Sequence, residues 1–226
     1  MTTSALIAIH NALSRHLPAG VASSSGPIAA THAPLAAAER AATARMSASR
    51  LQEFAAGRAH ARTVLLSLGL QSPVVPVGAD RAPLWPQGFV GSISHGGELV
   101  VAVAAPSTVL RAIGIDLEPR LPLDSELLSR VCRPEEVRRL QASPDPLQRA
   151  KLIFSAKESV YKCVAPLMGL FLEFEDLEVV FSADDGQFSV RGHGPAKSLI
   201  RPETVTGRFV EAGAYWLTVA WQGPAS

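Results

Sequence analysis

The chain has 226 residues, of which 47% are hydrophobic and 18% charged, and its formal net charge at pH 7 is +1. This composition excludes disorder for most of the chain, because disordered segments combine few apolar residues with a high net charge. The near-zero charge also argues against a nucleic acid polymer as partner, since such binding needs many basic residues to neutralise phosphates. The length predicts one large domain or two small subdomains.

The chain is expected to be soluble and cytoplasmic. Its N-terminal segment lacks the basic residues that open a signal peptide. The longest apolar run, residues 99–105, is far shorter than the roughly 20 residues that span a bilayer. Cys132 and Cys163 have neither CxxC nor CxxH spacing, which predicts free thiols in a reducing compartment rather than a disulfide or a zinc site.

The first part of the chain is predicted to consist of helices separated by loops. We expect a helix over residues 4–17, a loop or edge strand over 20–34, and one or two helices over 35–69. The second of these runs over 47–68, with Gly69 as its C-terminal stop. Prolines and glycine or aspartate breaks predict a long loop over 71–91, and long loops in compact domains tend to be functional.

The hydrophobic period changes after this loop. Residues 99–105 and 110–118 are apolar runs of strand length. Helices are expected over 124–130, 134–141 and 146–164, and strands over 177–181, 187–191, 206–211 and 214–222. The pattern predicts an α+β protein with two comparable lobes, 1–115 and 116–226, and a site at their junction.

Asp116 and Glu118 stand at the end of the second apolar strand, just before Pro119. Residues two apart on a strand point to the same face, so the two carboxylates lie side by side. A partly buried pair of anions is costly unless a cation neutralises it, and Mg²⁺ commonly binds one or two carboxylates together with substrate phosphates. The alternative is a solvated strand end that is acidic without a metal.

Glu158 and Lys162 lie in the predicted helix 146–164. Glu158 follows Phe154 by four residues and precedes Tyr161 by three, so it faces the apolar stripe of the helix rather than solvent. A carboxylate there suggests a third metal ligand or a general base, and Lys162 beside it could neutralise a phosphate. The two side chains could also form an ordinary i,i+4 ion pair.

Arg58 lies inside the apolar arc of the predicted helix 47–68, together with Phe54 and Leu65. A guanidinium in such an arc needs an anion, and a phosphate matches its planar fork. The alternatives are a side chain that extends along the apolar surface to reach water, or an internal salt bridge.

The segment GSISHGG, residues 91–97, directly precedes the first apolar strand. Small residues let backbone amides approach a ligand, and Ser94 with His95 can bind a phosphate. The segment has neither the GK[ST] of a Walker loop nor a G-x-S-x-G elbow, so Ser94 is a poor candidate nucleophile. Taken with the three carboxylates and the arginines, it favours a metal-assisted reaction at a pyrophosphate.

Three motifs occur in order along the chain: WPQGFVGSISH, GIDLEP and FSAKESVYK. They resemble the 4′-phosphopantetheinyl transferase superfamily, Sfp type, and the upstream MSASRLQEFAAGRAHARTVLLSLG resembles its enterobactin synthetase component D branch. The resemblance covers about residues 17–222. It implies two pseudo-twofold-related lobes, each a small mainly antiparallel sheet with packed helices. It also implies transfer of the phosphopantetheine arm of coenzyme A to a serine of an apo carrier protein, with release of adenosine 3′,5′-bisphosphate.

The resemblance implies roles for individual residues. Asp116 and Glu118 would hold Mg²⁺, or Mn²⁺, with the Leu117 carbonyl or a water nearby. Glu158 would complete the metal shell or deprotonate the carrier serine, and Lys162 would contact the pyrophosphate and stabilise the leaving group. Asp116, Glu158 and Lys162 are thus the expected catalytic residues. Coenzyme A would be bound at its phosphates by Arg50, Arg58, Ser94 and His95, on its adenine side by Arg81, Ala82, Pro83 and Leu84, and along its pantetheine arm by Leu172.

The expected partners are coenzyme A and apo acyl or peptidyl carrier proteins of polyketide, nonribosomal peptide, siderophore or fatty acid synthesis, with the chain acting as a monomer and without a membrane. Carrier proteins are typically acidic, so the basic segment 133–151 could receive one, the alternative being a solvated helix face. The apolar turn 167–171 could extend that surface or belong to the core. A second hypothesis is a non-catalytic carrier-protein or nucleotide binding module with the same fold.

Overall fold

The computed structural model describes residues 2–28, 34–169, 171–182 and 185–224. The N-terminal part holds α1 (Thr2–His16), β1 (Ala22–Pro27), α2 (Ala37–Arg40), α3 (Ala48–Ser67), β2 (Phe89–Gly96) and β3 (Leu99–Pro106). The C-terminal part holds β4 (Ala112–Pro119), η1 (Ser125–Leu127), α4 (Leu128–Val131), α5 (Pro134–Leu140), α6 (Pro146–Met168), η2 (Phe174–Asp176), β5 (Leu177–Phe181), β6 (Gln187–Gly192), η3 (Gly194–Ala196), β7 (Thr206–Ala212) and β8 (Tyr215–Gln222). No helix in these described ranges is both long and apolar enough to cross a membrane.

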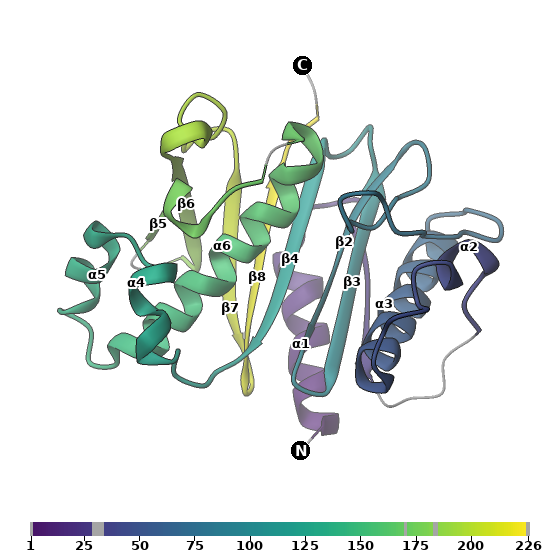
Figure 1. Cartoon of the computed structure of the whole chain (residues 1–226), viewed down its shortest axis with the longest axis horizontal. Helices are drawn as coiled ribbons and strands as arrows, with labels where there is room; N and C mark the ends of the chain where they lie inside the picture. Colours follow the sequence, from purple (N-terminus) through teal and green to yellow (C-terminus); the bar gives the residue numbers. More distant parts are fainter. Residues whose placement is uncertain (1, 29–33, 170, 183–184, 225–226) are drawn as a thin grey trace.

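The strands form two antiparallel sheets that lie side by side (Figure 1). The smaller sheet has the order β1-β3-β2 and the larger the order β4-β8-β7-β6-β5. Helices pack on both sheets, so the predicted α+β class with two mainly antiparallel sheets is confirmed. The two sheets differ in size, with three strands in one and five in the other among the described residues.

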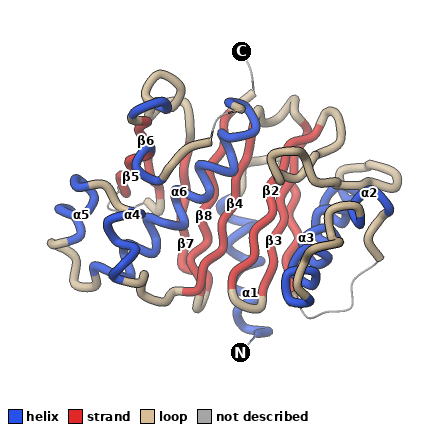
Figure 2. Tube along the Cα trace, in the orientation of Figure 1, coloured by secondary structure: helices blue, strands red, loops and turns tan. Residues whose placement is uncertain are grey.

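The sheets meet where β2 runs beside β4, and side chains rather than a backbone ladder join them. The hydroxyl of Ser92 accepts a hydrogen bond from the Ile115 amide at 3.1 Å, and that of Ser94 accepts one from the Leu117 amide at 3.2 Å. At Gly96 a Cβ would clash with the Leu117 carbonyl oxygen. The strands of both sheets therefore form a nearly continuous band across the molecule (Figure 2).

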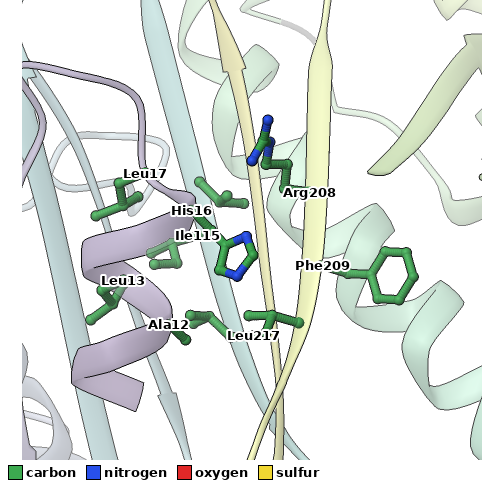
Figure 3. Close-up of a pocket in the computed structure, with 10 residues that line it drawn as sticks. Ala12, Leu13, His16, Leu17, Ile115, Arg208, Phe209 and Leu217 are labelled. Atoms are coloured by element: carbon green, nitrogen blue, oxygen red, sulfur yellow. The ribbon is translucent and has the colours of Figure 1, made fainter. Parts of the chain in front are cut away.

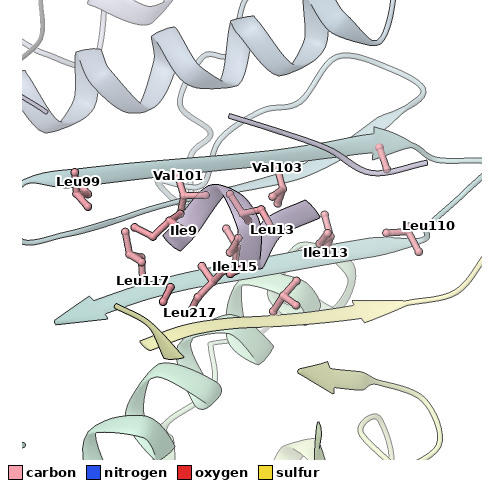
Figure 4. Packing of buried hydrophobic residues seen from close by; sticks show 14 residues of the cluster. Ile9, Leu13, Leu99, Val101, Val103, Leu110, Ile113, Ile115, Leu117 and Leu217 are labelled. Carbon is pink, nitrogen blue, oxygen red and sulfur yellow. The ribbon is translucent and has the colours of Figure 1, made fainter. Parts of the chain in front are cut away.

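Alternation along β3 and β4 gives this band two different faces. Their odd-numbered residues, with Ile9 and Leu13 of α1, form one core that spans both sheets (Figure 4). Even-numbered residues of β3 pack against α3, and even-numbered residues of β4 face α6. Helices α3 and α6 therefore lie on the same side of the band, opposite α1, with the β2–β4 seam between them.

Most predicted elements are confirmed. In place of the helix predicted over 124–130, the structure has the 3-10 turn η1 followed by the short helix α4. Helix α3 begins after Ser47, whose hydroxyl accepts from the Arg50 amide, and the chain leaves it through Gly69 at φ +92°. Helix α6 continues past the expected residue 164 to Met168 and includes Pro166 in its last turn. Gly169, left-handed at φ +61°, ends it. β2 begins inside the predicted loop 71–91. The sequence did not predict this strand, because its small and polar residues lack an apolar strand pattern. Of the segment 20–34, residues 22–27 form an edge strand, and residues 29–33 lie outside the described ranges.

The predicted boundary between residues 115 and 116 falls inside β4. β4 pairs along its whole length with β8 of the larger sheet. The boundary between the two lobes therefore lies in the turn between β3 and β4, residues 107–111, and not in the middle of β4.

Gly114→Ala tests how closely α6 packs on β4. A Cβ at this position would clash with the Ser159 carbonyl oxygen, so the helix backbone would have to move. We expect the substitution to lower the free energy of unfolding by about 1–3 kcal/mol, the usual cost of overpacking. Urea unfolding followed by tryptophan fluorescence measures this, with Gly223→Ala as control because nothing lies within 4 Å of its Cβ position. Equal stability of the two variants would contradict the tight packing.

Candidate active site

A cavity of about 1300 Å³ lies over the β2–β4 seam, between α3 and α6. Its walls come from α3, the loop around residues 77–85, β2, β4 and α6. This volume exceeds that of most drug-sized ligand pockets, which run to about 1,000 Å³, and suits a ligand as large as a nucleotide conjugate. It brings together most residues that the sequence singled out: Arg50, Arg58, Arg81, Ala82, Pro83, Ser94, His95, Asp116, Glu118, Glu158 and Lys162.

Three predicted residues lie elsewhere. Leu84 is half exposed outside the cavity lining, and Leu172 is buried in the core between α6 and the larger sheet. Leu117 is an odd-numbered residue of β4, so its side chain lies in the core on the α1 side. Its carbonyl oxygen lies against Gly96 of β2. The structure therefore does not bring Leu84, Leu117 or Leu172 to the proposed ligand or metal.

Asp116 is 3% exposed and its carboxylate is fixed from three directions. One oxygen accepts from the Ser94 hydroxyl at 2.9 Å and from the Lys162 ammonium at 2.6 Å, and the other accepts from the Ser155 hydroxyl at 2.8 Å. Ser94 also accepts from the Leu117 amide and lies 3.1 Å from the Lys162 nitrogen. The Ser94 hydroxyl thus orients Asp116.

The other two carboxylates differ in their partners. Glu118 forms an ion pair with Lys151, with 2.5 Å between Oε2 and Nζ. Glu158 lines the cavity and has no hydrogen bond or ion pair to any described residue. Burial raises the pKa of both, and repulsion from Asp116 adds to it in each case. The three carboxylates therefore act on one another electrostatically within one cavity.

Their chemistry fits a hard divalent cation, since oxygen donors of like charge gain most from one. In their present rotamers, however, no group of three His, Cys, Asp or Glu side chains in the described ranges converges closely enough to hold an ion. Lys162 and Lys151 neutralise two of the carboxylates instead. A bound cation would have to share or replace these lysine contacts.

The opposite wall of the cavity is basic. Arg58 is 6% exposed, its guanidinium lies 4.4 Å from the Phe54 ring centroid, and its buried Nε has no hydrogen-bond partner. Burial lowers the pKa of Arg58 to about 10, which still leaves the side chain charged at neutral pH. The position predicted from the helical arc is confirmed, and this unpaired donor in a cavity wall suits an anionic ligand.

Arg50, Glu53 and His95 form a second cluster on this wall. Arg50 Nη1 donates to Glu53 at 2.9 Å and lies 2.8 Å from Nε2 of His95. Burial lowers the pKa of His95, and the nearby positive charges of Arg50 and Lys162 act in the same direction. His95 is therefore neutral at pH 7 and accepts at Nε2 in this arrangement. Arg81 reaches the cavity from a left-handed backbone, at φ +67°.

Sequence reasoning missed several residues of the site. Glu53 is one helical turn from Arg50, Tyr161 belongs to the quoted motif FSAKESVYK, and Trp85 to the motif WPQGFVGSISH. All three line the cavity, as does Phe171, whose ring meets that of Tyr161 edge-on at 5.9 Å. Phe171 is an exposed part of the turn 167–171, of which residue 170 lies outside the described ranges.

The basic segment 133–151 mostly satisfies its charges within the chain. Arg133 donates to the Glu175 carbonyl and Arg139 forms an ion pair with Glu178. Arg149 lies 4.4 Å from the Phe181 ring centroid, and Lys151 pairs with Glu118. The remaining base, Arg138, has a side chain that is 71% exposed and pairs with Glu135 at 3.6 Å.

A second cavity lies on the α1 side of the band (Figure 3). It is lined mainly by apolar side chains of α1, β4, β7 and β8, together with His16 and Arg208. Its volume of about 10 Å³ admits at most one water molecule, so it is a packing defect rather than a ligand site.

Comparison with known proteins agrees with this geometry. Residues 38–105 match the 4′-phosphopantetheinyl transferase N-terminal domain, and residues 112–220 match the 4′-phosphopantetheinyl transferase superfamily. The two matched regions meet at the turn between β3 and β4. The chain belongs to the 4′-phosphopantetheinyl transferase superfamily.

Three individual relatives are similar to this chain, and two of them are named 4′-phosphopantetheinyl transferases. The chain is 40% identical over 157 residues to the 4′-phosphopantetheinyl transferase Svp of Streptomyces mobaraensis, covering 68% of this chain and 63% of that protein. It is 33% identical over 165 residues to PptT of Mycobacterium tuberculosis, covering 73% and 72%. It is 40% identical over 116 residues to enterobactin synthase component D of Salmonella typhi, covering 50% and 47%. The chain thus spans a little less than two thirds of the Streptomyces relative.

Glu158→Gln tests the electrostatic state of the carboxylates. Because the pKa of Glu158 is raised on folding, the folded state holds this proton more tightly than the unfolded state does. Ionised Glu158 therefore lowers stability above its folded pKa, and the penalty vanishes below its unfolded pKa of about 4.3. In EDTA we expect Glu158→Gln to be more stable than the original chain at neutral pH, with the difference shrinking towards zero near pH 4.

Urea unfolding at a series of pH values measures this difference. Glu203→Gln, at an exposed position, removes the same charge and should show no comparable pH dependence. A Glu158→Gln variant that is less stable than the original chain at neutral pH would contradict the raised pKa.

Proposed function

We propose that this chain is a magnesium-dependent 4′-phosphopantetheinyl transferase. It transfers the phosphopantetheine arm of coenzyme A to a serine of an apo acyl or peptidyl carrier protein, giving the holo carrier and adenosine 3′,5′-bisphosphate. The observation that carries the proposal is the pairing of two walls in one cavity, arginines with His95 on one side and three carboxylates on the other. Family membership supports the same activity.

The basic wall binds the phosphates of coenzyme A. The unpaired Nε of Arg58 supplies a buried donor, and a phosphate oxygen accepts from it without competition from an internal carboxylate. Arg50 and His95 lie together on this wall, and the loop around Arg81 lines the same cavity. These positions support binding of the nucleotide end of the substrate along α3 and β2.

The nucleophile belongs to the carrier protein. Its serine Oγ attacks the phosphorus that bears the pantetheine arm, the bond from that phosphorus to the bridging oxygen breaks, and adenosine 3′,5′-bisphosphate leaves with that oxygen. Glu158 lines the cavity, forms no hydrogen bond or ion pair with any described residue and has a raised pKa, so it is available either as the base that takes the serine proton or as a third metal ligand. Lys162 stabilises the negative charge that develops on the leaving group.

Asp116 and Glu118, together with Glu158 where it does not act as the base, are the residues that would hold Mg²⁺. The ion would supply positive charge against the pyrophosphate. Ser94 and Ser155 keep the Asp116 carboxylate in place through their hydroxyl donors. Lys162, which pairs with Asp116, lines the same cavity and can donate to a phosphate bound there.

The remaining features of the proposal concern the setting of the reaction. The acceptor is a carrier protein of fatty acid, polyketide, nonribosomal peptide or siderophore synthesis, and the chain works as a monomer. We propose the cytoplasm as its location, and the two free cysteines accord with a reducing compartment. Residues up to the β3–β4 turn supply the phosphate wall, and those after it supply the carboxylates.

Mass spectrometry of an apo carrier protein incubated with coenzyme A, Mg²⁺ and this chain tests the proposal. We expect the carrier to gain the mass of the phosphopantetheine arm. Glu158→Gln should slow the gain by at least about 100-fold, the usual minimum for loss of acid–base catalysis. Asp116→Ala should also slow it strongly, because it removes a residue that would hold the metal. Glu203→Gln, with the same charge change on the surface, should act normally.

Two outcomes would overturn the proposal. One is formation of a stable complex with the carrier without added mass, which identifies a binding module in place of an enzyme. The other is near-normal transfer by both site variants, which removes the assigned residues from the mechanism.

A further inference from the structure

Lys151 holds one carboxylate of the site, although neither the motifs nor the family resemblance points to it. It lies on α6, and its Nζ is 2.5 Å from Oε2 of Glu118. The side chains of both residues are 19% exposed, so the pair is largely shielded from water. Shielding strengthens an ion pair of this kind relative to one on the open surface.

The surroundings keep Lys151 on Glu118. Its ammonium lies 4.9 Å from the centroid of the Phe154 ring, one turn further along α6, which favours a cation at this spot. Glu118 is its ion-pair partner within the described part of the chain. Lys151 does not line the cavity, so a bound phosphate offers it no second anion.

Lys162 differs in this respect. It lines the cavity beside Glu158 and pairs with Asp116. A phosphate in the cavity can draw Lys162 away from Asp116 and free that carboxylate for a cation. No equivalent exchange is open to Lys151, so Glu118 stays paired whether or not a phosphate is bound.

We propose that Lys151 is an internal counter-cation that competes with the divalent ion for Glu118 and thereby sets the affinity of the site for metal. The inference rests on the proposed magnesium site. A divalent ion reaches Glu118 only by breaking a charge-assisted hydrogen bond, so Asp116 and Glu158 carry most of its binding. Lys151 is a positioning residue in this scheme, because it acts through Glu118 and not on the substrate.

The experiment measures Mn²⁺ binding alone, without coenzyme A or carrier protein. Bound Mn²⁺ loses the sharp electron paramagnetic resonance signal of the free ion, so a titration gives Kd directly. Lys151→Met removes the charge and keeps an unbranched chain to pack on Phe154. We expect it to bind Mn²⁺ more tightly than the original chain, by about threefold to tenfold for loss of a shielded ion pair.

A double-mutant cycle identifies the partner. Glu118→Gln should change Kd by less than about twofold in the original chain, because Glu118 is already occupied, and should abolish the gain in the Lys151→Met background. Lys151→Arg keeps the charge and should bind as the original chain does. Lys197→Met, at an exposed position, removes the same charge far from the site and controls for net charge.

Three results would overturn the inference. These are an unchanged Kd in folded Lys151→Met, an equal loss of affinity on Glu118→Gln in both backgrounds, and no Mn²⁺ binding by any variant. Thermal unfolding shows that each variant is folded, and Lys151→Gln replaces Lys151→Met if the latter is not. If the carrier protein gains no mass while the Mn²⁺ results hold, the proposed transferase activity fails and the role of Lys151 stands.

Discussion

The seam between β2 and β4 is the constraint on which the rest of the structure depends. Two strands from different sheets run side by side here, and serine hydroxyls take the place of backbone partners. The Ser94 hydroxyl joins the two sheets and also donates to Asp116, and its oxygen lies 3.1 Å from the Lys162 nitrogen. The contact that holds the two lobes together therefore also orients the first carboxylate of the site, and such a network is stronger than its separate bonds.

The strand alternation explains why a charged site can lie beside a large core. Along β4, Ile113, Ile115 and Leu117 face α1 and contribute to a core shared by both sheets. The intervening residues face α6, where Gly114 lets the helix backbone approach and Asp116 and Glu118 follow. The apolar face stabilises the lobes against each other. The stability of the apolar core offsets the free energy that burial of the carboxylates on the opposite face costs. Functional sites commonly lower the stability of a protein in this way.

Sequence periodicity located those site residues whose orientation is set by their own helix or strand. The strand period predicted that Asp116 and Glu118 share one face. The helical period predicted that Glu158 and Arg58 point towards the interior. Features that depend on distant segments were not predictable in this way. β2 owes its strand to pairing with β3, and the roles of Ser94 and Lys151 depend on partners 22 or more residues away. The Leu117 carbonyl lies against β2 because the two sheets meet there. The local sequence pattern does not predict that contact.

The charges of the cavity are balanced within the chain, and this shapes what the site can bind. Lys162 and Lys151 neutralise Asp116 and Glu118, while Glu53 accepts from Arg50 on the opposite wall. A cation alone would displace Lys162 from Asp116 and leave the ammonium without an anion. A phosphate alone would draw Lys162 away and leave the Asp116 carboxylate without a cation. A pyrophosphate that arrives with a divalent ion supplies both signs at once, so Lys162 and Asp116 can exchange partners without leaving a buried charge alone. The near-neutral composition of the chain accords with such an exchange, since the same balance of acids and bases serves the site with and without its substrate.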